Sequence, residues 1–323
     1  MQFQPKEILI EIALHLSDKD LQSWCKTGLT TCNENFFKER TIRRYGTKVA
    51  SLVNNYTNWY KSKHGQELSV IYELHIDPKL STFKSAIISN NIQLVAYLIH
   101  TFHIDPSIDN NYAIKFASIS GYTEIVRILL SDARVDPSIS NNFAIRFASA
   151  NGHAGVVQLL LSDSRVDPAS SNNCAIREAS DKGHTELVRI LLSDSQVDPS
   201  ADNDFAIRQS SRNGHTDVVR LLLSRPQVDP SADNNSSIQW SCEKGHVEIV
   251  KLLLANSRVD PSANDNFCIQ YASMHGHVQI VKLLLLHPRV DPSANNNHAL
   301  TSASYKNHSE IVKLLRSDHR FRE

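Results

Sequence analysis

The dipeptide Asp-Pro recurs at one fixed interval along most of this chain. Its Asp residues lie 31 residues apart, at positions 105, 136, 167, 198, 229, 260 and 291. A glycine column keeps the same step from Gly121 to Gly276, and a histidine column follows it by one position from His153 to His308. Periods of about 20–50 residues are typical of stacked repeats. The sequence therefore predicts an array of short units rather than a fold around one central core.

Each unit reads as two short helices joined by a tight turn and followed by an extended loop. In one unit, residues 143–149 form the expected first helix and residues 156–161 the second. Gly152 lies between them and suits the left-handed residue that ends a helix. Pro168 follows the second helix and prevents it from continuing. The expected order is therefore helix, turn, helix, loop in every unit.

A single unit of this size cannot be stable alone. Burial of four side chains such as Ile125, Val126, Leu129 and Leu130 stabilises a unit by about 6–12 kcal/mol. Ordering the backbone of the same unit costs about 30 kcal/mol or more. Stability must therefore come from contacts between neighbouring units.

The second-helix entry Gly-His-x-Glu-Leu-Val-x-x-Leu-Leu, from Gly183 to Leu192, resembles ankyrin repeats. That resemblance implies an all-α ankyrin-repeat α-solenoid. Ankyrin units are commonly longer by two residues and open with Thr-Pro-Leu-His, so we expect shortened hairpin loops, as in the ankyrin proteins of large DNA viruses and some amoebae. Eight repeats are expected over residues 77–318, with a tail at 319–323; their helix pairs begin near residues 83, 114, 145, 176, 207, 238, 269 and 300.

Residues 1–46 do not follow the repeat and form a separate predicted domain. The apolar pattern from Pro5 to Leu21 resembles an F-box, although Gln4 stands where that motif has Leu. The F-box family binds the Skp1 adaptor of a cullin-based ubiquitin ligase. By resemblance, the Skp1-type contact would involve Pro5, Ile8, Leu9, Ile12 and Leu16. The alternative is that these helices only cap the array, and residues 47–76 are expected to be a helical connector or a degenerate repeat.

Composition excludes several classes of function. The chain of 323 residues has 34 basic and 34 acidic side chains, so it lacks the basic excess of a nucleic-acid binder. No run approaches the ~18–20 apolar residues that cross a membrane. Its five cysteines are scattered, which is typical of a reducing compartment. We therefore expect a monomeric intracellular protein that binds neither nucleic acid nor membrane. The expected compartment is the cytoplasm or, for a viral protein, the cytoplasm or nucleus of the host.

The histidines and aspartates of the repeat have a structural interpretation. One His and one Asp-Pro occur per unit, whereas a zinc ion needs several ligands around one centre. We expect each His of the column to bond to an inter-helix turn, and each Asp to organise a turn before its Pro. No phosphate loop, nucleophile elbow or catalytic carboxylate pair is present. The prediction is a protein without catalytic residues, metal or cofactor.

A basic column runs along the predicted first helices, at Lys115, Arg146, Arg177 and Arg208. It could form a groove for an acidic partner peptide. It could instead form an internal ladder with loop residues such as Asp202 and Asn203. The zero net charge of the chain favours the ladder.

Two positions before each glycine vary freely while the scaffold stays constant, and in ankyrin arrays they line the concave target-binding face. The preceding column, which includes Phe116 and Phe147, is usually apolar core. Glu178 and Gln209 depart from it, so we expect their side chains to reach the concave surface. Trp240, Met274 and Tyr271 are expected to cluster in adjacent units, either as binding anchors or as packing between repeats. We predict a target-binding set made of Asp181, Lys182, Arg212, Asn213, Trp240, Glu243, Lys244, Tyr271, Met274, His275 and Tyr305.

The predicted function is that of a substrate-recruiting adaptor of a Skp1-cullin-F-box ligase, with an unknown protein target. The first alternative is an ankyrin scaffold or competitive inhibitor with no link to ubiquitin transfer. The second alternative is an anion- or metal-binding protein that uses the Arg or His columns. Skp1 binding would separate the first two, and metal analysis would test the last.

Overall fold

The computed structural model describes residues 78–321, and the chain divides into one unit that ends at Ile104 and another that begins at Asp105. Over the described residues the structure has sixteen helices and no strand. The all-α prediction is therefore confirmed for this part of the chain. The predicted F-box-like domain and connector, residues 1–46 and 47–76, lie outside the described residues.

The described part of the first unit is one helix pair. Helix α7 (Pro78–Ile88) and helix α8 (Ile92–His100) bury Phe83, Ile87 and Val95. Asn91 caps α8, because its side-chain oxygen accepts a hydrogen bond from the backbone N–H of Leu94 at 3.1 Å.

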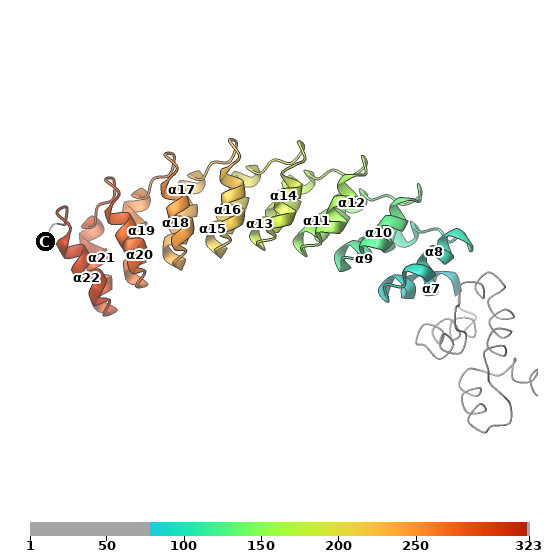
Figure 1. Ribbon diagram of the computed structural model, residues 1–323, viewed down its shortest axis with the longest axis horizontal. Coiled ribbons are helices and arrows are strands. Elements are labelled where there is room, and N and C mark those ends of the chain that lie inside the picture. Colours follow the sequence, from blue (N-terminus) through green and yellow to red (C-terminus); the bar gives the residue numbers. More distant parts are fainter. Residues whose placement is uncertain (1–77, 322–323) are drawn as a thin grey trace, which may run out of the picture. The chain divides into compact units, whose positions relative to one another are not determined.

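The second unit is one row of seven helix pairs (Figure 1). The first helices of these pairs are α9 (Ile108–Ser120), α11 (Ile139–Ala150), α13 (Ser170–Asp181), α15 (Ala201–Asn213), α17 (Ala232–Lys244), α19 (Ala263–Met274) and α21 (Ala294–Tyr305). The second helices are α10 (Thr123–Leu130), α12 (Ala154–Leu161), α14 (Thr185–Leu191), α16 (Thr216–Leu223), α18 (Val247–Leu254), α20 (Val278–Leu285) and α22 (Ser309–Ser317). First helices pack on first helices and second helices on second helices, so the unit is an α-solenoid.

The core is a continuous layer between the two helix rows. Ile145 and Ala148 of α11 and Val156, Val157 and Leu160 of α12 are all completely buried. Each large aliphatic side chain of this kind contributes about 1.5–3 kcal/mol when removed from water. The same positions are buried in the neighbouring pairs, which explains how stacking supplies the stability that a single unit lacks.

The turn between the two helices of a pair explains the Gly-His columns. Gly152 has φ +78°, and a Cβ atom placed on it would lie 2.7 Å from the His184 ring of the next repeat. The same ring places Nε2 3.3 Å from the carbonyl oxygen of Ala150. The prediction that the histidines bond to an inter-helix turn is confirmed, and the turn belongs to the preceding repeat.

Three successive residues in the left-handed conformation open each first helix of the second unit. In α11 these are Ser140, Asn141 and Asn142, with φ of 55°, 59° and 55°. Asn, Asp and Ser fill this triplet in every repeat, because short polar side chains tolerate positive φ better than branched ones do. The regular part of α11 begins at Phe143, as the sequence predicted.

The third residue of the triplet joins adjacent repeats through the Asp-Pro loop. Asn142 Oδ1 accepts the backbone N–H of Asp167 at 2.8 Å. The Asp167 carboxylate in turn accepts the backbone N–H of Ala169 at 2.9 Å. The interpretation of Asp before Pro as an organiser of the turn is therefore confirmed.

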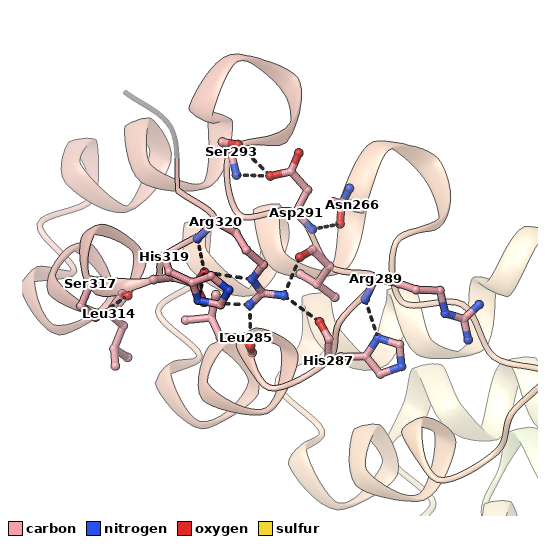
Figure 2. Close-up of polar contacts among 12 residues, drawn as sticks. Asn266, Leu285, His287, Arg289, Asp291, Ser293, Leu314, Ser317, His319 and Arg320 are labelled. Carbon is pink, nitrogen blue, oxygen red and sulfur yellow. Dashed lines mark hydrogen bonds and ion pairs between the residues drawn. The ribbon is translucent and has the colours of Figure 1, made fainter.

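The C-terminal end of the row is closed by Arg320, which lies within the predicted tail (Figure 2). Its guanidinium is paired with Asp318 at 2.7 Å. It also donates hydrogen bonds to the carbonyl oxygens of Leu285, His287 and Val290, the last two at 2.9 Å. Arg165 makes a single bond of this kind inside the row, to Val135 O at 2.7 Å. Arg320 therefore satisfies carbonyl groups of the preceding pair at the end of the stack.

Candidate protein-binding surface

One side of each first helix does not enter the core, and these sides together form a continuous surface. We call it the first-helix face. It consists of the half-buried and exposed side chains of α9, α11, α13, α15, α17, α19 and α21 together with the two residues that precede each turn. All residues of the predicted target-binding set lie on this face.

In the middle of the face, Asp181 and Lys182 take part in contacts within the chain. Lys182 Nζ lies 3.2 Å from the Asp181 carboxylate. Asn213 Nδ2 donates to the Asp181 carbonyl oxygen at 3.0 Å and to its carboxylate at 2.9 Å. Asp181 is half-buried and joins two repeats, whereas the exposed Lys182 is the more available of the two residues.

The next two repeats carry charged and aromatic side chains together. The Arg212 guanidinium lies over the Trp240 ring, 5.3 Å from its centroid. On the same helix as Trp240, Lys244 Nζ pairs with the Glu243 carboxylate at 2.9 Å. A cation over an indole ring is a favourable arrangement that also holds both groups in position. In this part of the face, charged and aromatic side chains of neighbouring repeats therefore contact one another within the array.

Towards the C-terminal end the face becomes more aromatic. Tyr271 stacks on Phe267 with centroids 3.8 Å apart, and the His275 ring lies 6.4 Å from the Tyr271 ring. Met274 is half-buried, and Tyr305 is 81% exposed. Over the described residues, no ring contact links Trp240 to Tyr271, so these two rings lie on neighbouring first helices without forming the expected ring cluster.

The basic column divides into two parts. Arg177 forms an ion pair with Asp202 of the next repeat, and Arg208 Nη1 lies 2.9 Å from the Asp233 carboxylate. Arg208 Nε also donates to the Asn203 carbonyl oxygen at 2.8 Å. The predicted internal ladder is confirmed for these two arginines.

Comparison with protein families gives the identity of the fold. The family model described as ankyrin repeats in three copies matches residues 83–172, 176–265 and 257–322, which is most of the chain. The chain belongs to the ankyrin-repeat family. A search of curated proteins finds no match.

Ankyrin repeats support a role in protein–protein interaction, and such proteins are generally interaction modules rather than enzymes. The family match begins at residue 83, so it does not include the F-box-like segment. Because the model matches ankyrin repeats in general, the similarity to viral and amoebal arrays stays a prediction.

The first two repeats of the second unit present aromatic side chains, and two of them, Phe116 and Phe147, belong to the column expected to be apolar core. Phe147 is 39% exposed and stacks on Phe143 with centroids 4.1 Å apart. Tyr112 and Phe116 form an equivalent pair at 5.7 Å, and Ile119 is 37% exposed. The interpretation of this column as apolar core is wrong for Phe147. Its phenyl ring lies on the outer side of α11, whereas Ala144 and Ala148 of the same helix face the core.

The ankyrin array does not gather ligands for a metal over residues 78–321. No group of three or more His, Cys, Asp or Glu side chains there could hold a metal ion. Burial raises the pKa of the Cys242 thiol well above its usual value, and the neighbouring Cys268 raises it further. That thiol is therefore a poor nucleophile. Among the described helices, none is long and apolar enough to cross a membrane.

Proposed function

We propose that the ankyrin array binds a protein target on its first-helix face. The observation that carries this proposal is the variation of that face against a constant scaffold. The Gly, His and Asp-Pro columns keep their contacts from repeat to repeat. The two residues before each glycine change from Ala150-Asn151 to Asp181-Lys182 and to Met274-His275. A surface of this kind matches the concave target-binding face of the family.

The side chains on the face are suited to binding a protein. Trp, Tyr and Arg dominate the energetic centres of protein interfaces, because they bury a large area while keeping a polar group available. Trp240, Tyr271 and Arg212 are of these types and lie on three consecutive repeats. We expect their truncation to alanine to weaken target binding by about thirtyfold or more each, which corresponds to the threshold of about 2 kcal/mol that marks a hot spot.

The proposal can be tested by photo-cross-linking from single positions of the full chain. A photoreactive phenylalanine analogue would replace Tyr305 on the first-helix face or Lys313 on the second helix of the same repeat. Both positions are exposed, so the two probes are matched in exposure and differ only in the face on which they lie. A second matched pair is Lys244 on the face and Lys251 on α18.

In extracts of cells that express the protein, we expect one cross-linked target from positions 305 and 244. We expect none from positions 313 and 251. Equal cross-linking from all four positions, or cross-linking from the second helices alone, would contradict the proposal.

We further propose that residues 1–46 recruit a Skp1-type adaptor, so that the chain links its target to ubiquitin transfer. Support comes from the F-box-like sequence pattern, in which Pro5, Ile8, Leu9, Ile12 and Leu16 would form the contact. The array would raise the effective concentration of the target beside the transfer machinery. In this proposal residues 47–76 connect that segment to the repeats.

Binding of purified Skp1 by the full chain tests this second role. We expect saturable binding by the wild type and its loss in the double variant Leu9→Asp, Ile12→Asp. Tyr305→Ala, on the array, should bind Skp1 as the wild type does. The conservative variant Pro5→Ala should weaken binding without abolishing it. Failure of the wild-type chain to bind would leave an ankyrin scaffold or competitive inhibitor.

A further inference from the structure

The ion pairs of the basic column follow one register. Arg177 pairs with Asp202 and Arg208 with Asp233, and each pair is separated by 25 residues in the sequence. The carboxylate always comes from the first residue of the left-handed triplet of the next repeat. The residue 25 positions after each cation therefore decides whether that cation is neutralised within the chain.

The same register fails in the first two repeats of the second unit. The residues 25 positions after Lys115 and Arg146 are Ser140 and Ser171, which carry no charge. Over the described residues, no carboxylate lies within ion-pair distance of Lys115 or Arg146. These two cations occupy ladder positions without the partner that the ladder supplies elsewhere.

Asp109, in the left-handed triplet at the start of α9, does not supply the missing carboxylate to Lys115. Asp109 precedes Lys115 by six residues on α9, as Asp202 precedes Arg208 on α15. Asp202 forms its ion pair with Arg177 of the previous repeat. To Arg208 it offers only its backbone carbonyl oxygen, at 3.2 Å.

Both unpaired cations lie over aromatic rings. Lys115 Nζ lies 5.9 Å from the centroid of Phe143, and the Arg146 guanidinium carbon lies 5.7 Å from that of Phe147. Arg146 Nη2 donates to the Ser140 carbonyl oxygen at 3.3 Å, while its Nε atom is buried without a hydrogen-bond partner. The Nε atom of the paired Arg177 is buried in the same way, so this atom does not distinguish Arg146. The Nη1 atom of Arg146 makes no hydrogen bond within the described residues, so the guanidinium keeps donor capacity for an anionic acceptor.

The surroundings of the two cations are apolar and partly exposed. We call Tyr112, Phe116, Ile119, Phe143 and Phe147 the α9–α11 aromatic surface. The two aromatic pairs are stacked, and Ile119 and Phe147 are more than one third exposed. The two helices that carry it are neighbours in the row (Figure 1). A charge interaction is strengthened where aromatic rings exclude water.

We propose that the α9–α11 aromatic surface, with Lys115 and Arg146, binds an acidic segment of a partner protein. Asp or Glu side chains of that segment supply the carboxylates that Asp202 and Asp233 supply in the middle repeats. An apolar side chain of the segment packs on Phe147 and Ile119. This inference rests on the proposed target-binding function of the first-helix face and names the chemistry of the target.

The test restores the missing carboxylates without changing either cation. Ser140→Asp with Ser171→Asp would extend the internal ladder to Lys115 and Arg146. Ser140→Asn with Ser171→Asn is the matched neutral variant. Both substitutions suit the left-handed backbone, because Asp202 and Asn264 occupy the same triplet position with φ of 61° and 53°.

The probe is a fluorescein-labelled short peptide of Glu and Asp around a central Leu-Phe pair, and its binding to the full chain is measured by anisotropy. We expect saturable binding by the wild type and the Asn variant, and a loss of about tenfold in affinity in the Asp variant. Lys115→Ala with Arg146→Ala should lose as much. Arg177→Ala, which removes a cation that is already paired, should change the affinity less than about twofold.

Several results would overturn the inference. The first is that the wild type shows no saturable binding of the peptide. The second is that the Asp and Asn variants bind it with equal affinity. The third is that a probe with Gln and Asn in place of the acidic residues binds as well as the acidic probe. Tighter binding of a single-stranded oligonucleotide than of the peptide would assign the surface to another class of partner. Cross-linking from Tyr305 is scored separately, so loss of the acidic probe with a persistent cross-link refutes this inference and leaves the proposed function standing.

Discussion

The repeats built on α9 and α11 and those built on α13 and α15 share one scaffold but differ in charge on the same surface. All four first helices bury an Ile and an Ala inward, and a second inward Ala in α9, α11 and α13 is replaced by Ser210 in α15. Each of the four repeats turns at a left-handed glycine and opens with a left-handed triplet. In the α13–α15 region the arginines are neutralised by aspartates of the next repeat. In the α9–α11 region, serines stand at those positions and supply no carboxylate. The cations of both regions lie over phenyl rings, so the missing carboxylate is the difference between them.

This difference separates the residues that hold the array together from those that define its surface. The scaffold contacts run through backbone groups and buried apolar atoms, so they do not depend on which polar residue fills the first place of the triplet. The charge of the face does depend on it. The comparison predicts equal stability effects at scaffold positions in the two regions and unequal effects at ladder positions.

The largest expected effect is at the turn glycines. Gly152→Val and Gly214→Val place a branched side chain at φ +78° and +82° and against the rings of His184 and His246. We expect each to lower the free energy of unfolding by roughly 2–4 kcal/mol, measured by urea unfolding. Gly155→Ala, inside α12, serves as the control and should change stability by less than about 1 kcal/mol. A much smaller loss in Gly152→Val than in Gly214→Val would break the claim that the scaffold is shared.

An intermediate effect is expected at the buried third residue of the triplet. Burial raises the pKa of the Asp204 carboxyl above its usual value of 3.8, although the backbone N–H of Asp229 donates to it and lowers that pKa. Asn142 holds the same place in α11 and accepts the equivalent hydrogen bond. Asp204→Asn should therefore stabilise the chain at neutral pH by about 1 kcal/mol, and Asn142→Asp should destabilise it by a similar amount.

The pH dependence of this pair follows from the raised pKa. Ionised Asp204 opposes folding above its folded-state pKa, and this penalty disappears as pH falls through that pKa towards 3.8. The difference between wild type and Asp204→Asn in urea unfolding should thus be present at pH 7 and shrink in acid. A difference that grows as the pH falls would refute the assignment.

The smallest effect is expected at the ladder cations themselves. The Asp202 side chain is 47% exposed, so its pair with Arg177 is strongly screened by water. Arg177→Ala should destabilise the chain by about 0.5 kcal/mol or less, and high salt should reduce that loss. Arg146→Ala should change stability even less, because no carboxylate loses a partner. A salt-dependent loss in Arg146→Ala larger than that in Arg177→Ala would show a hidden partner for Arg146.

Sequence reasoning predicted the parts of the fold that repeat. The fixed step of Gly152, Asp167 and their equivalents predicted helix pairs, and the stacking followed from the free-energy deficit of a single unit. The ladder at Arg177 and Arg208 was also predicted, because charges in register can be read from the sequence. Phe147 was not placed correctly, since an aromatic residue among alanines has the same pattern whether its ring points inward or outward.

The left-handed triplet was also beyond the sequence analysis. Its Asn-Asn pairs are visible in the sequence, but a run of polar residues before a helix usually predicts an ordinary loop. The sequence does not show that the backbone N–H of Asp167 donates a hydrogen bond to Asn142 Oδ1. This long-range contact accompanies the three successive residues at positive φ. The target-binding set stays a prediction, because only a bound partner distinguishes an anchor such as Tyr271 from a ring that packs within the array.

The triplet also has a consequence at the level of codons. Asp, Asn and Ser fill its first position in the second unit, and each Asn codon is one nucleotide change away from an Asp codon and from a Ser codon. One point mutation from Asp to Asn at position 202 or 233 removes the negative charge beside an arginine of the preceding repeat. Two successive point mutations, through Asn, add a negative charge at Ser140 or Ser171, and Asp, Asn and Ser all occur at this left-handed position. The surface charge of each repeat can therefore drift independently under selection for new partners, without passing through an unfolded intermediate sequence.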